Sequence, residues 1–221
     1  MLREVSPRAE DRLEGLSDTA WALIEAHGEF YQADDGDTIL ALGQTDKHLL
    51  IVLSGLATLV YFQDGQRQPT AVYRTPGEVL HHAGMHLQIV NPFAIEAAKA
   101  ETRFVLIKRE TVYEMIGKDV LFAEYLFKDL SERFFVALSY LREQRQEPLI
   151  IRLGKRIMLI TEHRPAIEFT QAELAEILAV TRISISKAIK SLEELGLVQR
   201  VDRALMTVDR EKLKAWLDDQ D

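Results

Sequence analysis

Between Phe30 and Ile107, short apolar runs alternate with polar segments that contain glycine. The runs are rich in β-branched and aromatic residues and recur at regular spacing, which is typical of strands in an antiparallel sandwich or barrel. Ahead of them we expect a helix from Asp18 to His27, with Trp21 and Ile24 on its buried face. Asp64-Gly65 is expected at a hairpin tip. The predicted strands are residues 38–42, 49–53, 57–62, 70–73, 93–97 and 103–107.

Beyond Ile107 the apolar period changes from two to about three and a half. A helix from about Asp119 to Gln146 is predicted, about 40 Å long, and Pro148 should end it. One apolar row follows strict steps of four and three, as in a coiled coil, so we expect this helix to pair two chains. The alternative is a helix packed only on its own domain. A second apolar row (Phe122, Leu126, Leu138) could pack on the β domain while the heptad row faces another chain. The predicted dimer-interface residues are Ala123, Phe127, Leu130, Phe134, Ala137 and Leu141.

The strongest local signal begins at Thr170. Thr170 and Glu173 have the spacing of a capping box, which predicts a helix running to about Leu178. Thr181 can then cap a second helix running towards Leu195, and Gly196 can end it. Two short helices joined by a tight turn are therefore expected in this segment.

The second of these helices has two unlike faces. One is apolar, whereas the other is basic and hydroxyl-bearing, with no acidic residue in its first turn. After Gly196 a small hairpin is expected, with Arg200 and Arg203 at its tip. A basic helix face beside a basic hairpin suits reading of the DNA major groove, although a helical hairpin within a larger core is the alternative. The predicted DNA-binding residues are Thr170, Thr181, Arg182, Ser184, Ser186, Lys187, Lys190, Arg200 and Arg203.

Over nearly its full length the chain resembles the Crp/Fnr family of bacterial transcription regulators. The motifs that carry the resemblance are Leu53-Ser-Gly55, Pro76-Gly-Glu78, the heptad helix and the segment from Phe169 to Val198. The resemblance implies an α+β fold made of an antiparallel β-roll, or double-stranded β-helix, a long dimerisation helix and a winged helix-turn-helix. We expect a β-roll effector domain over residues 1–110, the coiled-coil helix over 111–147 and the DNA-binding domain over 148–221.

The same resemblance implies a sequence-specific DNA-binding regulator that is a homodimer on a palindromic operator, with RNA polymerase as a further partner. Arg182 then occupies a base-reading position, and Lys187 stands where arginine is usual. Ile183 stands where many members have a base-contacting glutamate, so the operator sequence does not follow from the resemblance.

Family members that bind cyclic AMP use a glutamate for the ribose and an arginine for the cyclic phosphate. Here His82 stands in place of that glutamate, and Pro92-Phe93 stands in place of the arginine-containing pair. The sequence offers no reason to expect Arg74 or Lys99 to substitute. A buried phosphate without a charged partner is costly, so we predict that cyclic AMP does not act here in the usual way. The β-roll is then either a sensor of an unknown small-molecule effector or a vestigial domain.

Three histidines near this segment raise a rival hypothesis, a cupin-like metal-binding enzyme. His81 and His82 are adjacent and would point to opposite faces of a strand, however, and no histidine follows His86 before His163. We expect a polar loop that borders a pocket, and neither catalytic residues, nor a metal, nor a cofactor. The other rival is a cyclic-nucleotide-binding-like module that acts on a protein partner. The predicted effector-pocket residues are Glu78, His81, His82 and His86.

Composition narrows the function classes further. The 221 residues contain no cysteine, which excludes disulfides, thiolate metal sites and cysteine-ligated clusters. With no apolar run of membrane-span length and no signal-peptide pattern at the N-terminus, we expect a cytoplasmic protein without membrane contact. The net charge of −8 falls wholly within residues 1–148, because residues 149–221 hold 12 basic and 12 acidic side chains. The overall charge therefore does not argue against DNA binding by the C-terminal third.

Overall fold

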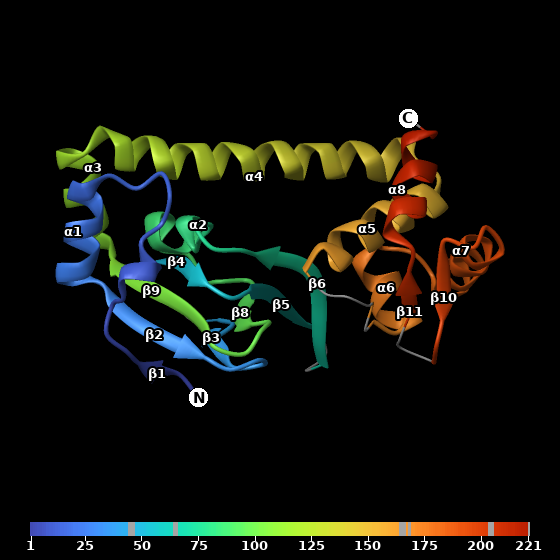
Figure 1. Cartoon of the computed structure of the whole chain (residues 1–221), viewed down its shortest axis with the longest axis horizontal. Helices are drawn as coiled ribbons and strands as arrows, with labels where there is room; N and C mark the ends of the chain where they lie inside the picture. The colour runs from blue at the N-terminus through green and yellow to red at the C-terminus, as the bar shows by residue number, and fades with distance from the viewer. Residues whose placement is uncertain (44–46, 64–65, 164–166, 168, 203–205, 221) are drawn as a thin grey trace. The chain divides into compact units, whose positions relative to one another are not determined.

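The computed structural model describes residues 1–43, 47–63, 66–163, 167, 169–202 and 206–220 (Figure 1). It contains two compact units, Met1–Phe135 and Val136–Asp221, and the long helix α4 (Val120–Gln146) runs from the first into the second. Within the described residues, no helix is both long and apolar enough to cross a membrane.

The N-terminal unit contains two antiparallel sheets, as the sequence predicts. The five-stranded sheet has the order β1-β2-β9-β4-β7, and the four-stranded sheet has the order β3-β8-β5-β6. All six predicted strands are present, whereas the sequence analysis missed β1, β2 and β7. The strands are β1 (Arg3–Glu4), β2 (Glu29–Ala33), β3 (Thr38–Leu40), β4 (His48–Ser54), β5 (Ala57–Gln63), β6 (Gln66–Arg74), β7 (Val79–Leu80), β8 (Ala94–Ala97) and β9 (Thr102–Lys108).

Strand β4 shows how the unit is layered, because it is apolar on both faces. Leu49 and Ile51 belong to a core cluster shared with the helices, whereas Leu50 and Val52 belong to a cluster shared with the second sheet. Successive side chains of a strand point to opposite faces, so a continuous apolar run fits a strand covered on both sides. The core of this unit thus has a layer between the sheets and a layer beneath the helices.

Helices α1 and α4 begin and end close to where the local sequence predicts, whereas the 3₁₀ turn, α2 and α3 were not foreseen. Helix α1 is capped by Ser17, whose Oγ accepts the Ala20 N–H at 3.0 Å, and Trp21 and Ile24 are buried as expected. Helix α4 begins at Val120, and the side chain of its third residue, Phe122, is completely buried. The unit also contains a 3₁₀ turn (Ala9–Asp11). Its other helices are α1 (Asp18–His27), α2 (His82–Leu87) and α3 (Arg109–Lys118).

Helix α2 corrects the expectation of a loop around the histidines. His81 adopts a left-handed conformation (φ 69°) and precedes the helix, and His82 is its first residue. The pair therefore lies at a helix start and does not point to opposite faces of a strand. Gly84 is needed on this helix, because a Cβ there would lie 1.9 Å from His81 Nε2.

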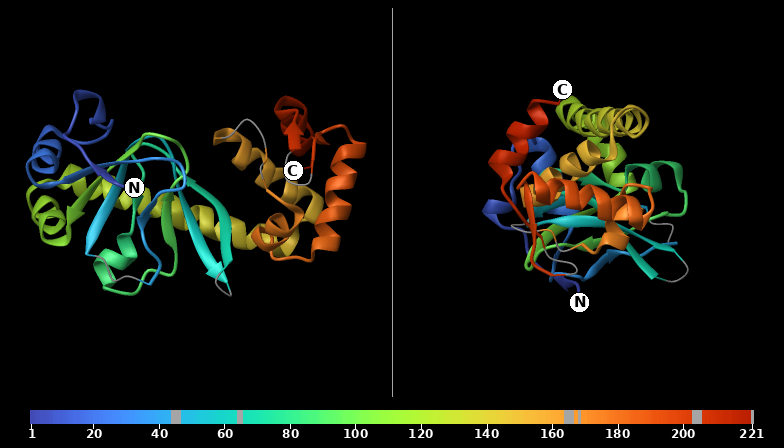
Figure 2. Two further views of the ribbon diagram at one scale, coloured as in Figure 1. Left: turned by 90° about the horizontal axis from the view of Figure 1, so that it is seen from below. Right: turned by 90° about the vertical axis from the view of Figure 1, so that its right-hand side faces the viewer.

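The C-terminal unit is a helical core with a two-stranded hairpin (Figure 2). The two predicted helices and the hairpin are present, whereas α5 and α8 were not foreseen. The tip of this hairpin, with Arg203, and the predicted Asp64-Gly65 tip lie outside the described residues. The elements are α5 (Leu149–His163), α6 (Gln171–Ile177), α7 (Arg182–Glu194), β10 (Val198–Arg200), β11 (Met206–Val208) and α8 (Arg210–Asp218).

Candidate nucleic-acid interface and ligand cavity

Helix α6 begins with the predicted capping box. The Glu173 N–H donates to Thr170 Oγ1 at 3.2 Å, and the Thr170 N–H donates to Glu173 Oε2 at 2.7 Å. Both groups would otherwise lack partners at a helix start, so this terminus is defined by local sequence. The Thr170 side chain is therefore held in place by hydrogen bonds to the first turn of its own helix.

The turn between α6 and α7 is equally well defined. Ala179 has a positive φ of 53°, and the Val180 N–H donates to the Ala175 carbonyl at 2.9 Å. Thr181 then caps α7, because its Oγ1 accepts the Ser184 N–H at 3.2 Å. Thr181 and Ser184, both predicted to contact DNA, already support the helix start, and their hydroxyls also lie 2.9 Å apart.

Helix α7 separates an apolar face from a basic face as expected. Ile185, Ile189 and Leu192 are completely buried and Ala188 is 7% exposed. Arg182 and Lys187 are exposed, and no acidic residue occurs in the first turn. The exposed start of α7 thus combines a guanidinium with the positive end of the helix dipole, an arrangement that attracts phosphate and base acceptors. Lys190 is exposed as well, 3.7 Å from Glu194.

A hollow of about 890 Å³ lies in front of this helix start. It brings three predicted DNA-binding residues together, Thr170 from α6, Arg182 from α7 and Arg200 from β10. The Arg200 guanidinium also lies 3.4 Å from Glu193, which holds the end of β10 against α7. Ser184, Ser186, Lys187 and Lys190 do not line the hollow but lie further along α7.

The predicted dimer-interface row of α4 is largely uncovered in the single chain. Large aromatic and aliphatic side chains rarely remain so exposed along one helix without a partner. The second apolar row behaves differently, since Phe122 is buried and Leu126 packs against the core, although Leu138 is 49% exposed. The exposed fractions in the heptad row are 73% for Phe127, 50% for Leu130, 65% for Phe134 and 61% for Leu141.

A second cavity, of about 280 Å³, lies within the N-terminal unit. Its wall comes from Leu59 of β5, the end of β6, β7, the start of α2, residues 89 and 91–93, and Leu130 and Arg133 of α4. Of the predicted effector-pocket residues, His81 and His82 line it, whereas Glu78 and His86 do not. His86 instead places its Nδ1 2.6 Å from the Tyr113 hydroxyl.

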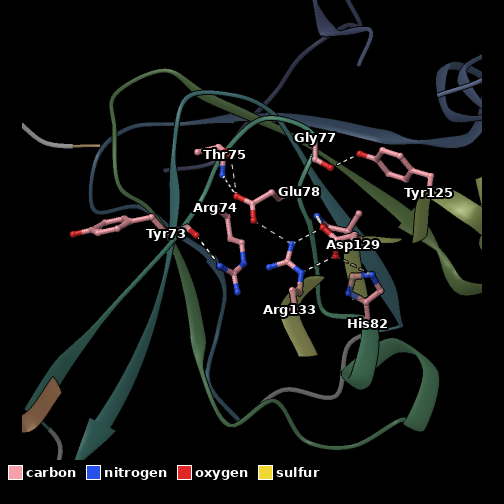
Figure 3. A network of polar contacts seen from close by, with 10 residues as sticks. Tyr73, Arg74, Thr75, Gly77, Glu78, His82, Tyr125, Asp129 and Arg133 are labelled. Carbon is pink, nitrogen blue, oxygen red and sulfur yellow. Dashed lines mark hydrogen bonds and ion pairs between the residues drawn. The ribbon is translucent and has the colours of Figure 1, made fainter. Parts of the chain in front are cut away.

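Two arginines face this cavity, and among the described residues only Arg133 forms an ion pair. Arg133 donates to Asp129 at 2.6 and 2.7 Å and lies 3.6 Å from Glu78. Arg74 donates from Nη1 to the Tyr73 carbonyl at 2.7 Å, and its buried Nε has no hydrogen-bond partner (Figure 3). Among the described residues, no carboxylate lies within ion-pair distance of Arg74, and the charges of Glu78 and Asp129 act on it only from further away.

Burial controls the protonation of Arg74 and His82 in this wall. Burial, followed by the neighbouring charge of Arg133, lowers the pKa of Arg74 to about 10, so it stays cationic at neutral pH. Burial lowers the pKa of His82 to about 4, with Asp129 opposing the shift, so this imidazole is neutral. Asn91, also in the cavity wall, has a buried Nδ2 without a partner. The free cation and the free amide donor both favour an anionic or acceptor-rich ligand.

The sequence analysis found no reason to place Arg74 here. Strand β6 carries it to the cavity, immediately before the Pro76-Gly77 turn, whereas Lys99 does not line the cavity. The spacing of strand residues alone does not reveal which loop they will face. Among the described residues, no three potential metal ligands gather at one point, which leaves the cupin-like hypothesis without a ligand set.

Comparisons with known proteins fit this geometry. Residues 139–216 match a family described as the Crp-like helix-turn-helix domain. A putative transcriptional regulator of the Crp/Fnr family from Eubacterium rectale aligns with a TM-score of 0.69 and 20% identity, over 92% of this chain and 95% of that one. A Crp/Fnr-family regulator from Thermus thermophilus aligns with a TM-score of 0.66 and 19% identity, over 86% and 98%.

The global regulator CLP from Xanthomonas campestris, described as c-di-GMP responsive, has a TM-score of 0.66 and 14% identity, over 85% of this chain and 98% of that one. No curated protein sequence matches the chain significantly. The chain therefore carries a Crp-like helix-turn-helix domain and has the fold of Crp/Fnr-family transcriptional regulators, as the sequence motifs indicated.

Proposed function

We propose that the protein is a homodimeric transcriptional regulator that binds an inverted-repeat operator and is controlled by a small anionic effector. The observation that carries the DNA-binding part is the capped start of α7, which exposes Arg182 beside Thr170 and Arg200 around one hollow. A short helix presented in this way suits insertion into the major groove. Arg182 is proposed to read guanine, and the hydroxyl and lysine side chains of α6 and α7 to contact bases and phosphates.

Dimerisation is proposed to occur through the heptad row of α4. The row exposes Phe127, Phe134 and Leu141 along one helix, and its steps of four and three are those of a two-stranded coiled coil. A two-fold axis along this helix would relate two copies of α7, so that the DNA site would be an inverted repeat with half-sites about 34 Å apart.

The cavity in the N-terminal unit is proposed to be the effector site. The partnerless buried Nε of Arg74 favours a single acidic group, and Asn91 can donate a further hydrogen bond. Leu59, Phe93 and Leu130 add apolar wall, so a compact organic acid with an apolar body fits this lining better than an inorganic ion. Cyclic AMP is not proposed, because His82 stands where the resemblance requires a ribose-binding glutamate.

The proposed site of action is the cytoplasm, with RNA polymerase as a further partner. A gel-shift assay with the full-length protein and the DNA upstream of its own gene tests the function. We expect a discrete complex that survives a hundredfold excess of random competitor DNA. A protein that shows no preference over the competitor, on this DNA or on selected DNA, would contradict the proposal and favour a module that acts on a protein partner.

A further inference from the structure

We propose that Ile183 determines operator specificity by contacting the C5-methyl group of a thymine in the major groove. This inference rests on the proposed DNA-binding function and adds a reading role for one side chain. Ile183 is the second residue of α7, directly after Arg182, and it is 70% exposed. Among the described residues of α7, it is the one large apolar side chain that is exposed.

Folding of the C-terminal unit does not account for this isoleucine. The packing of α7 is provided by its opposite face, where Ile185 and Ile189 are completely buried. A β-branched residue on an exposed helix surface gains no burial, and it has a lower helix propensity than alanine or lysine. The side chain thus contributes little to the stability of the isolated protein, and its apolar surface is expected to be buried against a binding partner.

The chemistry of the neighbouring surface indicates which partner group it meets. Arg182 and Lys187 are exposed on the same helix, so DNA is the ligand that this face attracts. Thymine presents the apolar group of the major-groove base edges, its C5-methyl. Isoleucine offers no hydrogen bond, so it can favour thymine over cytosine only through this methyl group. The glutamate found here in many Crp/Fnr members can instead accept from cytosine N4.

The test uses the full-length protein and a duplex that it selects from a random-sequence library. Each thymine of the selected site is replaced by deoxyuridine, in both half-sites together, and the affinity is measured by gel shift. We expect one symmetric pair of thymines to be sensitive, with a loss of about fourfold per methyl group and about fifteenfold for the pair. Replacing the same pair of thymines with 5-methylcytosine, paired to guanine, should retain more affinity than replacing it with cytosine.

Variants assign the effect to the side chain. Ile183→Ala should bind the thymine duplex more weakly and should no longer distinguish thymine from deoxyuridine. Lys187→Ala, changed on the same helix, should bind more weakly but keep the distinction. Both substitutions are at exposed positions, and circular dichroism verifies that each variant is folded.

Each outcome separates the two proposals. If a specific duplex is selected and every replacement of thymine is neutral, the role of Ile183 is overturned while the DNA-binding function stands. If Ile183→Ala keeps the full sensitivity to deoxyuridine, the role is likewise overturned. If no duplex is selected above random DNA, the proposed function and this inference both fail, and that is seen before any base is modified.

Discussion

The Val79 N–H donates to Oδ1 of Asp129 at 3.1 Å, which joins strand β7 directly to helix α4. Val79 lines the ligand cavity, and Asp129 is followed along α4 by Leu130, which lines the cavity and belongs to the heptad row. Asp129 also holds Arg133 by two hydrogen bonds. The cavity wall and the proposed dimer helix are therefore joined by direct contacts.

Replacing Asp129 with alanine should destabilise the N-terminal unit. The change leaves the buried Val79 N–H without its acceptor and removes both hydrogen bonds of Arg133, which keeps only Glu78 at 3.6 Å. We expect a loss of about 3 kcal/mol in the free energy of unfolding. Urea unfolding followed by the fluorescence of Trp21, in a Trp216→Phe background, measures it. Lys128→Ala is the control, since the Lys128 side chain is exposed, and losses of equal size in the two variants would contradict the role of Asp129.

Replacing Arg74 with glutamine should remove the response to anions. In the unchanged protein, compact aryl or alkyl carboxylates should raise the unfolding free energy by about 1.4 kcal/mol at ten times their dissociation constant. Differential scanning calorimetry with a panel of carboxylates, inorganic phosphate and cyclic AMP measures this response, and we expect cyclic AMP to have no effect. Lys99→Gln, outside the cavity wall, should respond like the unchanged protein. Identical responses from Arg74→Gln and the unchanged protein would exclude Arg74 as the anion site.

The stability of the N-terminal unit should depend on pH through His82. The groups that face it are Asp129, Arg133, Arg74 and His81, and burial lowers its pKa from 6.5 to about 4. Between these pH values His82 binds a proton in the unfolded chain but not in the folded chain, so the free energy of unfolding falls as the pH falls. The free energy of unfolding then changes by up to about 1.4 kcal/mol per pH unit.

His82→Gln lacks this contribution, so its stability should approach, or exceed, that of the unchanged protein as the pH falls from 6.5 towards 4. Urea unfolding at several pH values measures the difference between the two proteins, and their other titrating groups are shared. Two curves that stay parallel over this range would show that His82 is not buried in its neutral form.

A charge within the heptad row should separate the dimer. Leu130→Asp or Phe134→Asp would place a carboxylate where two apolar rows meet, and sedimentation equilibrium should then give the mass of one 25.2 kDa chain. The unchanged protein should give twice that mass. Leu159→Asp is the control, because Leu159 is also exposed (49%) but lies on α5. Equal masses for Phe134→Asp and the unchanged protein would rule out this interface.

Local signals predicted helices α6 and α7 best. The hydroxyls of Thr170 and Thr181 fix the helix starts within a few residues, and Gly196 ends α7 with a φ of 65°. Short apolar runs between glycine-containing segments predicted six of the strands, and the heptad steps predicted α4. These features depend on contacts between near neighbours in the chain, which is why the sequence alone is sufficient for them.

The ligand cavity depended on contacts that are distant in the chain. Arg74 and Arg133 are separated by almost sixty residues, and only the packing of α4 on the sheet brings both to one wall. The short helix α2 was also missed, because its Gly84 and two histidines do not form an apolar period. The burial that makes His82 neutral is likewise a tertiary effect, and no local pattern encodes it.

The central claim is that α7 reads a DNA sequence, and selection from a random duplex library tests it most directly. The full-length protein should enrich an inverted repeat whose half-site centres lie 10–10.5 base pairs apart, or a multiple of that distance. Arg182→Ala should weaken binding to this repeat by about 1–3 kcal/mol while changing binding to random DNA much less. A library that shows no enriched repeat, or an Arg182→Ala variant that loses affinity equally for both DNAs, would contradict sequence reading by this helix.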